Sequence, residues 1–293
     1  MKLCLSCETA FDNQSWNCPE CAFFPNSENG LLAFCPELAE KSEGFEAEHF
    51  SELVKVEAGS FWFRARNKLI IWGLKKYFPH MKNFLEIGCG TGFVLSAIEN
   101  SFSDLDLYGS EIFTAGLGYA KERVAKVNLF QMDARNIPFR EEFDVIGIFD
   151  VLEHIEQDTK VLEMIYRALK PGGGVIVTVP QHRFLWSKYD EFSRHIRRYS
   201  RKELILKVKS AGFKIILVTS FVSLLLPLVI ASRLRWRVSE KEYDSMSQYN
   251  LGEFMNNLLE QVLLFELMLI KIGIRFSFGS SLLLVAYKEN NNL

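Results

Sequence analysis

A glycine-rich turn at residues 88–92 has the composition of a ligand-binding loop. It lies in the run Leu85-Glu86-Ile87-Gly88-Cys89-Gly90-Thr91-Gly92. Glycines let the backbone turn tightly and approach a ligand closely, and the N–H groups at the start of a following helix can bind a polar group. A plain turn is the simpler alternative. The apolar run before the glycines and the helical pattern after them favour a binding loop.

The residues around this turn indicate the kind of ligand. Glu86 lies two residues before the first glycine, where its carboxylate would oppose a pyrophosphate and suit an ammonium group. The spacing is Gly-x-Gly-x-Gly, with Phe93 where a dinucleotide-binding loop would have its third glycine. Both features favour S-adenosylmethionine over a nicotinamide dinucleotide, and they disfavour an oxidoreductase.

Two acids follow the next two expected strands. Glu111 comes 23 residues after Gly88 and is placed to accept hydrogen bonds from both ribose hydroxyls. The alternative for Glu111 is a solvated acid at a helix start. Asp133 would accept a hydrogen bond from an adenine amino group, and an ordinary turn aspartate explains its spacing equally well.

Three histidines are the candidate general bases. Methyl transfer from a sulfonium needs in-line positioning of the nucleophile, and it needs a base only where the acceptor must lose a proton. The candidates are His154, His182 and His195, which follow the fourth and fifth expected strands. For His154, the alternative is a ring that only orders its loop.

The segment 180–201 is rich in arginine. Arginine matches phosphate or carboxylate groups bidentately, so this segment suggests an anionic acceptor, and a solvated charged face is the alternative. The arginines are Arg194, Arg197, Arg198 and Arg201.

Apolar runs alternate with helical patterns between residues 81 and 220. We expect strands at 83–87, 105–109, 128–131, 143–149, 175–179 and 214–218, and a last one at 282–287. The run 143–149 is nearly all apolar, as in a strand covered on both faces. This order predicts a doubly wound α/β sheet with ligands at the carboxyl ends of its strands.

These features together resemble class I S-adenosylmethionine-dependent methyltransferases over about residues 81–220. The glycine loop, Glu111, Asp133 and the run Phe143–Ile155 carry the resemblance, and Leu169-Lys170-Pro171-Gly172-Gly173 supports it. The sequence is most similar to the subgroup with coenzyme Q O-methyltransferases and polysaccharide-associated bacterial enzymes. The resemblance implies a Rossmann-like, seven-stranded sheet with an antiparallel last strand. It also implies that the residues holding the cofactor are Glu86, Gly88, Cys89, Gly90, Gly92, Glu111, Asp133, Ala134 and Asp150.

The N-terminal cysteines form two Cys-x-x-Cys pairs separated by ten residues, namely Cys4, Cys7, Cys18 and Cys21. Four thiolates at this spacing suit a structural Zn²⁺ ion, with iron as the lesser alternative. The N-terminus has no signal-peptide pattern, which favours metal binding over disulfides. Some ribosomal RNA methyltransferases carry such a module, so RNA is an alternative acceptor. The net charge of -2 and pI of about 6.3 do not favour nucleic acid.

The composition and hydrophobic pattern of the chain predict three parts. Residues 1–40 form a zinc-ribbon-like module, residues 41–80 form connecting or lid helices, and residues 81–293 form the methyltransferase domain with a helical insertion at about 221–278. In the second part, Trp62, Arg64 and Arg66 would either fold over the cofactor or pack in the core.

The stretch 215–232 holds 18 residues without a charge, which is long enough to cross a bilayer. Pro227 interrupts it, so we expect a buried strand followed by a packed helix, with peripheral membrane contact as a further expectation. We therefore expect a cytoplasmic protein, or one peripheral to the inner membrane face.

The expected function is methylation of a small-molecule acceptor or of a lipid- or saccharide-linked one, with an anionic acceptor group suggested by the arginines. The rival hypotheses are a ribosomal RNA methyltransferase guided by the zinc ribbon and a catalytically silent scaffold that keeps the cofactor fold. The sequence specifies neither the methylated atom nor an oligomeric state.

Overall fold

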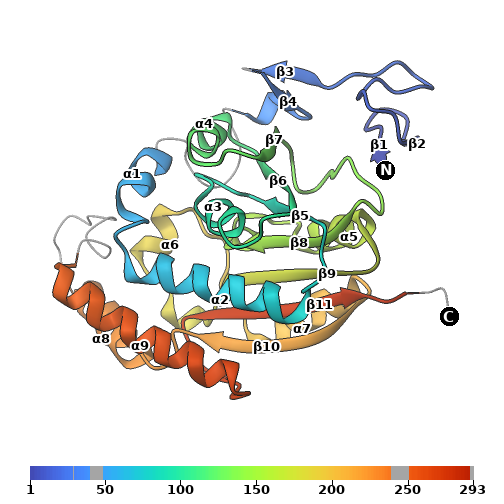
Figure 1. Cartoon of the computed structure of the whole chain (residues 1–293). Helices are drawn as coiled ribbons and strands as arrows, with labels where there is room; N and C mark the ends of the chain where they lie inside the picture. Colours follow the sequence, from blue (N-terminus) through green and yellow to red (C-terminus); the bar gives the residue numbers. More distant parts are fainter. Residues whose placement is uncertain (29, 40–48, 239–250, 291–293) are drawn as a thin grey trace.

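A mixed sheet of nine strands runs through the computed structural model, which describes the chain except residues 29, 40–48, 239–250 and 291–293 (Figure 1). In spatial order the strands are β10 (Phe213–Phe221), β11 (Ser281–Lys288), β9 (Leu169–Pro180), β8 (Phe143–Phe149), β5 (Asn83–Ile87), β6 (Asp106–Glu111), β7 (Val127–Gln131), β4 (Leu31–Ala33) and β3 (Asn26–Glu28). Strand β11 is antiparallel to both of its neighbours. The predicted doubly wound fold with an antiparallel last strand is confirmed.

Two strands of the sheet come from outside the predicted set of seven. Strand β4 pairs in parallel with β7 and antiparallel with β3, so residues 26–33 extend the sheet by two strands. The sequence pattern predicts that these residues belong to the zinc-ribbon-like module of residues 1–40. Strands of three residues contain too little alternation to be recognised from sequence.

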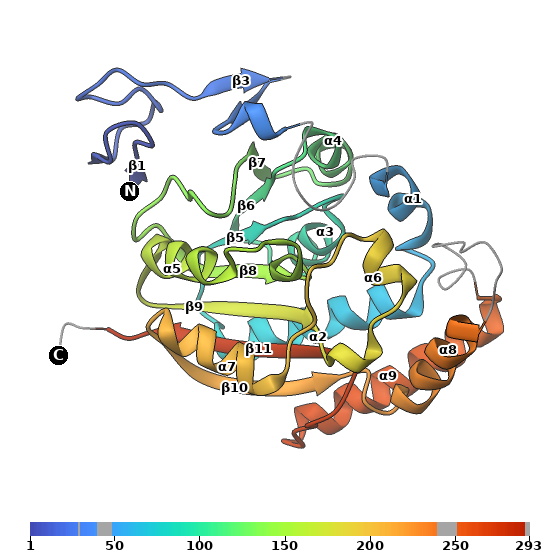
Figure 2. The ribbon, with the colours of Figure 1, turned by 180° about the vertical axis from the view of Figure 1, so that it is seen from behind.

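Helices cover both faces of the sheet because neighbouring residues of a strand point to opposite faces. Phe84 of β5 packs with Leu69 of α2 (Phe61–Tyr77), whereas the adjacent Leu85 belongs to the core that contains Val161 of α5 (Asp158–Ala168). On the first face lie also α3 (Phe93–Glu99) and α4 (Thr114–Arg123), and on the second α7 (Arg201–Ser210). Figures 1 and 2 show these two layers from opposite sides.

The insertion between β10 and β11 consists of α8 (Leu226–Val238) and α9 (Glu253–Lys271), and residues 239–250 between them lie outside the described residues. The uncharged stretch 215–232 is therefore a strand followed by a helix, as predicted. Among the described residues, no helix combines the length and apolar character needed to cross a membrane. Glu260 of α9 accepts hydrogen bonds from Arg64 and Lys68 of α2, at 2.8 and 2.7 Å, which fixes α9 against α2.

The N-terminal segment contacts the rest of the chain at the β7 end of the sheet. Its hairpin consists of β1 (Lys2–Leu3) and β2 (Ala10–Phe11). Trp16 packs edge-on against Phe34 and Phe139, with ring centroids 4.7 and 5.4 Å apart. These contacts and the β4–β7 pairing join the cysteine-containing segment to the main sheet.

Candidate active site

A cavity of about 1070 Å³ lies at the carboxyl ends of β5, β6 and β8. The glycine loop, α1 (His49–Val56) and α2 line it, together with the segment 189–198 and parts of α8 and α9. Ligand pockets in proteins usually measure about 300–1,000 Å³. The cavity is therefore large enough for a cofactor and a second molecule.

The glycine loop has the conformation that its sequence predicts. Gly88, Gly90 and Gly92 have φ angles of 70°, 52° and 74°, in the left-handed region that other residues rarely adopt. A Cβ on Gly88 would lie 2.4 Å from the side chain of Val151. Gly88 and Gly90 line the cavity, whereas Gly92 is the N-cap of α3 and lies against Ala120 of α4. Gly92 is thus a packing residue for two helices.

The carboxylate of Glu86 is buried at the cavity with one unsatisfied oxygen. The residue is 2% exposed, and its Oε2 has no hydrogen-bond partner among the described residues. Burial raises the pKa of Glu86 well above its ordinary value, and the nearby charge of Arg66 offsets this only in part. A buried, unsatisfied carboxylate is costly unless a ligand completes it. Glu86 therefore fits an ammonium group bound in the cavity.

Glu111 and Asp133 line the same end of the cavity and are held in place by other groups. Glu111 accepts hydrogen bonds from the backbone N–H groups of Gly90 and Ile112, at 3.0 and 2.8 Å. Asp133 accepts from both the backbone and the guanidinium of Arg135, at 2.8 and 2.9 Å. Since an ionised carboxylate can accept about four hydrogen bonds, both acids keep capacity for a ligand. Cys89 and Ala134 line the cavity beside them.

Asp150 lies at the end of β8 in a strained conformation. Its φ is 56°, which is uncommon for a residue other than glycine. Its carboxylate forms an ion pair with Arg66 of α2 and accepts a hydrogen bond of 3.1 Å from Thr178. Arg66 in turn lies over the ring of Trp62, 4.8 Å from its centroid. Of the two arginines in this cluster, Arg66 reaches the cavity, and Arg64 instead binds Glu260 of α9.

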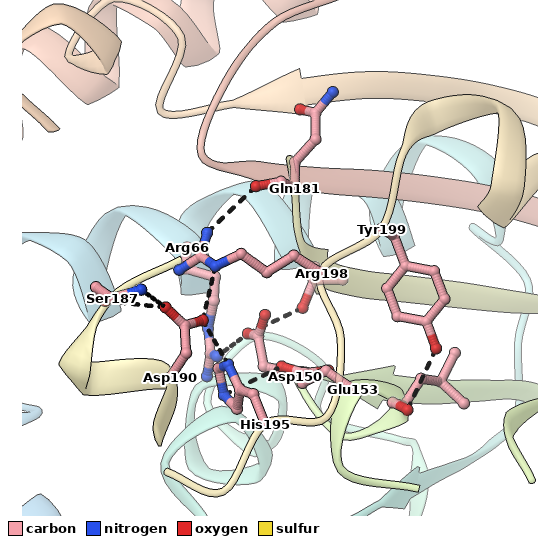
Figure 3. Close-up of polar contacts among 11 residues, drawn as sticks. Arg66, Asp150, Glu153, Gln181, Ser187, Asp190, His195, Arg198 and Tyr199 are labelled. Carbon is pink, nitrogen blue, oxygen red and sulfur yellow. Dashed lines mark hydrogen bonds and ion pairs between the residues drawn. The ribbon is translucent and has the colours of Figure 1, made fainter. Parts of the chain in front are cut away.

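His195 is the histidine best placed to act as a base. Its Nδ1 lies 2.8 Å from Asp190, which also accepts from Nε of Arg198 at 2.6 Å and from the N–H of Ser187 at 2.8 Å (Figure 3). Burial disfavours ionisation of Asp190, but His195 and Arg198 outweigh it and hold its pKa well below the usual range. Because the carboxylate is ionised, Nδ1 carries the proton, and Nε2 remains a proton acceptor.

The other two histidines are less suited to this role. Burial and the neighbouring His195 lower the pKa of His154 to about 3, so its ring is too weak a base near neutral pH. His182 does not line the cavity; its ring stacks on Phe184 and Phe278, with centroids 5.0 and 5.5 Å away. The structure brings His154 and His195 together and places His182 elsewhere.

Glu153 also lines the cavity, although it is not among the site residues predicted from sequence. It is fully buried, and neither carboxylate oxygen has a hydrogen-bond partner among the described residues. Its ligand atoms and those of His154 and His195 lie within 4.8 Å of one another, a donor set suited to a divalent cation. The spacing Asp150-x-x-Glu153-His154 after an apolar strand could have identified Glu153 as a site residue from sequence. No sequence pattern marks Asp190, the partner of His195.

The arginines of segment 180–201 are used mainly inside the protein. Arg197 binds Asp158 at 2.7 Å, Arg198 binds Asp190, and Arg201 donates to the backbone of Val218 at 2.9 Å. These three side chains orient the segment around the cavity. These three guanidinium groups are therefore engaged within the protein, and the predicted anionic acceptor group has little support from them.

The four N-terminal cysteines form a compact cluster apart from the cavity. Their sulfur atoms all lie within 4.8 Å of one another, and the Cys4–Cys21 and Cys7–Cys18 pairs are each 3.6 Å apart. Tetrahedral zinc with Zn–S bonds of about 2.3 Å places sulfur atoms about 3.8 Å apart. The cluster therefore fits a tetrahedral metal site.

Comparisons with known proteins identify similar chains. Residues 58–218 match the family described as "Methyltransferase domain". An uncharacterized protein of Methanocaldococcus jannaschii is 32% identical over 165 residues, which cover 52% of this chain and 76% of that protein. The ubiquinone biosynthesis O-methyltransferase of Rickettsia conorii is 30% identical over 135 residues, covering 43% of this chain and 44% of that enzyme.

Among solved structures, phosphoethanolamine N-methyltransferase 2 of Haemonchus contortus in complex with S-adenosyl-L-methionine has a similar fold. The TM-score is 0.51 at 23% identity, over 76% of this chain and 52% of the nematode enzyme. The present chain thus spans about half the length of that enzyme and less than half of the rickettsial one.

The Glu86 carboxylate oxygen that lacks a hydrogen-bond partner among the described residues should make cofactor binding depend on pH. Because the ammonium of S-adenosylhomocysteine favours the ionised carboxylate and burial favours the neutral one, binding should release a proton. Its affinity should rise as the pH increases through the raised pKa of Glu86. Glu86→Gln should weaken binding at least about tenfold and abolish the proton release.

Calorimetry in buffers of different ionisation enthalpy measures both effects, with Glu163→Gln on the exposed face of α5 as the matched control. Undiminished affinity in Glu86→Gln would show that this carboxylate does not bind the ammonium group.

Proposed function

Since this chain belongs to the family of S-adenosylmethionine-dependent methyltransferases, we propose that its methyl acceptor is a lipid-linked or otherwise partly apolar molecule. The observation that supports this is the lining of the cavity. Its lining includes Glu153, His195 and Arg198, whereas α8, α9 and the residue before α8 contribute mainly apolar side chains, namely Leu225, Leu228, Val229, Met255 and Leu259. An acceptor with a polar reacting end and an apolar remainder matches both kinds of side chain.

The residues proposed to bind the cofactor line the cavity. We propose that Glu86 and the glycine loop bind the amino-acid portion, Glu111 the ribose, and Asp133 with Ala134 the adenine, with Asp150 beside the cofactor. The cofactor, when bound, supplies a methyl group activated on a sulfonium. Helices α1 and α2 and the turn between them, from the predicted lid region 41–80, contribute Phe50, Glu57 and Trp62 to the wall and would exclude water from the site.

His195 is the proposed general base, and Asp190 is its positioning residue. Asp190 accepts the Nδ1 hydrogen, and Nε2 is then available to take a proton from an acceptor hydroxyl or amine. Arg198 binds the same carboxylate, which keeps Asp190 ionised. His154 packs edge-on against His195 at 4.7 Å between centroids and limits its rotation.

Transfer of tritiated methyl groups from S-adenosylmethionine tests this function. Purified protein is incubated with the lipid, small-molecule and RNA fractions of a bacterial extract, and radioactivity is measured in each. We expect label in the lipid fraction, and His195→Gln should lower the rate by about 10²–10⁴-fold without changing the affinity for S-adenosylhomocysteine.

The matched control is His80→Gln, in the turn before β5 and outside the cavity lining. Label confined to RNA would favour the ribosomal RNA alternative. Cofactor binding without labelling of any fraction would favour the silent scaffold.

We propose further that the N-terminal cysteines hold a structural zinc ion and that residues 1–40 form its module. Purified protein should contain about one zinc ion per chain. Cys18→Ser should lose this zinc and increase proteolysis of the N-terminal segment, while S-adenosylhomocysteine affinity is unchanged because the cluster lies outside the cavity.

Elemental mass spectrometry and limited proteolysis measure these effects, with the exposed Ser6→Ala, between two of the cysteines, as the control. Iron in place of zinc, or zinc retained by Cys18→Ser, would contradict the proposal.

A further inference from the structure

Helix α9 carries apolar side chains on two opposite faces. One face, with Leu263, Leu267 and Ile270, is buried in the core shared with α2. The other face is exposed: Phe254 is 80% exposed, Phe265 52% and Met268 48%, and Ile272 at the C-cap is 72% exposed. A helix that packs on one side only normally has polar residues on the other.

The spacing shows that the exposed residues form a continuous stripe. Phe254, Leu258, Phe265 and Met268 each lie two positions before a buried residue, which is about 200° around the helix. The exposed and buried pairs are Phe254 and Asn256, Leu258 and Glu260, Phe265 and Leu267, and Met268 and Ile270. The exposed stripe therefore faces directly away from the protein core.

Neighbouring elements enlarge this apolar surface. Helix α8 runs beside α9 in both views (Figures 1 and 2), and its Leu228 and Leu234 are 59% and 57% exposed. Phe184, in a short helix in contact with α8, and Phe278 are 56% and 65% exposed around the ring of His182. Apolar surfaces of this extent on soluble domains usually mark an interaction site.

The charges around this surface are mainly basic. Arg233 of α8 lines the cavity, and Lys271 and Arg275 are exposed at the C-terminal end of α9 and just beyond it. The two central acids of α9 are turned inward. Glu260 binds Arg64 and Lys68, and Glu266 accepts from the backbone N–H groups of Ser223 and Leu224.

In the described part of the two helices, Glu253 is the one exposed acid. An apolar surface bordered by arginine and lysine complements the anionic surface of a bilayer.

The surface is continuous with the mouth of the cavity. Leu228 and Met255 line the cavity and are also exposed at 59% and 44%. We propose that α8 and α9 dock this protein on the surface of an anionic lipid bilayer, with the exposed apolar side chains inserted between the headgroups. Entry of a lipid-linked acceptor through this mouth rests on the function proposed above, whereas the docking itself does not.

Sedimentation of the full-length protein with vesicles tests the docking. The vesicles consist of phosphatidylcholine alone or of phosphatidylcholine mixed with phosphatidylglycerol. We expect binding to the mixed vesicles that weakens with salt, and an at least about tenfold lower partition coefficient for Phe254→Ser/Phe265→Ser/Ile272→Ser, because three exposed apolar side chains are lost.

Leu206→Ser/Ile216→Ser is the control, because it removes exposed apolar side chains of α7 and β10, which are not part of the proposed docking surface on α8 and α9. This control variant should bind vesicles like the unchanged protein. Calorimetry with S-adenosylhomocysteine verifies that both variants keep a folded cofactor site. Equal vesicle binding by the unchanged protein and the triple variant overturns the proposal.

Absence of vesicle binding also overturns it. In that case, analytical ultracentrifugation shows whether the same surface binds a second copy of the chain, through self-association of the unchanged protein that the triple variant loses. Docking without methyl transfer to any lipid would leave the docking intact and refute the proposed acceptor.

Discussion

The site depends on two carboxylates at neighbouring strand ends, the buried Glu86 and the partly buried Asp150. Glu86 lies near the end of β5, and Asp150 directly follows β8. The guanidinium of Arg66 forms an ion pair with Asp150 and also lowers the free-energy cost of a negative charge on Glu86. Removing a charged partner from such a buried set is costly, since it leaves an uncompensated charge. Arg66 comes from α2, so this helix must lie over the cavity for the acids to be tolerated. One oxygen of Glu86 nevertheless stays without a partner among the described residues, and the cofactor's ammonium group would complete it.

The position of α2 depends in turn on the C-terminal insertion. Arg64 and Lys68, on the turns of α2 that flank Arg66, both bind Glu260 of α9, and Asn256 of α9 accepts a hydrogen bond from the backbone of Phe61 at 3.0 Å. The insertion thus holds the helix that supplies Arg66 and also contributes apolar side chains to the cavity wall. The contacts between α2 and α9 therefore connect the surface proposed to face a membrane with the residues proposed to bind the cofactor.

Much of the fold and of the cofactor end followed from sequence because the signals there are local. The apolar run 143–149 forms β8 with the predicted bounds, and the glycines at 88, 90 and 92 have the left-handed conformations that their residue type suggests.

The features that could not be predicted depend on contacts between residues far apart in the sequence. The three candidate histidines could not be ranked from sequence, because the order of strands predicts where a residue lies but not the direction of its ring. In the structure, His182 stacks on Phe278, and His195 contacts Asp190. The arginines of segment 180–201 looked available because their partners, such as Asp158, lie far away in sequence. Strands β3 and β4 were too short to show a period.

A crystal structure with S-adenosylhomocysteine tests the central claim most directly, because it locates the cofactor's ammonium group. The account predicts that this group lies within hydrogen-bond distance of the Glu86 carboxylate, with the ribose at Glu111 and the sulfur facing Asp150 and the cavity that contains His195. An ammonium group directed to solvent, or a ligand bound outside the glycine loop, would contradict it.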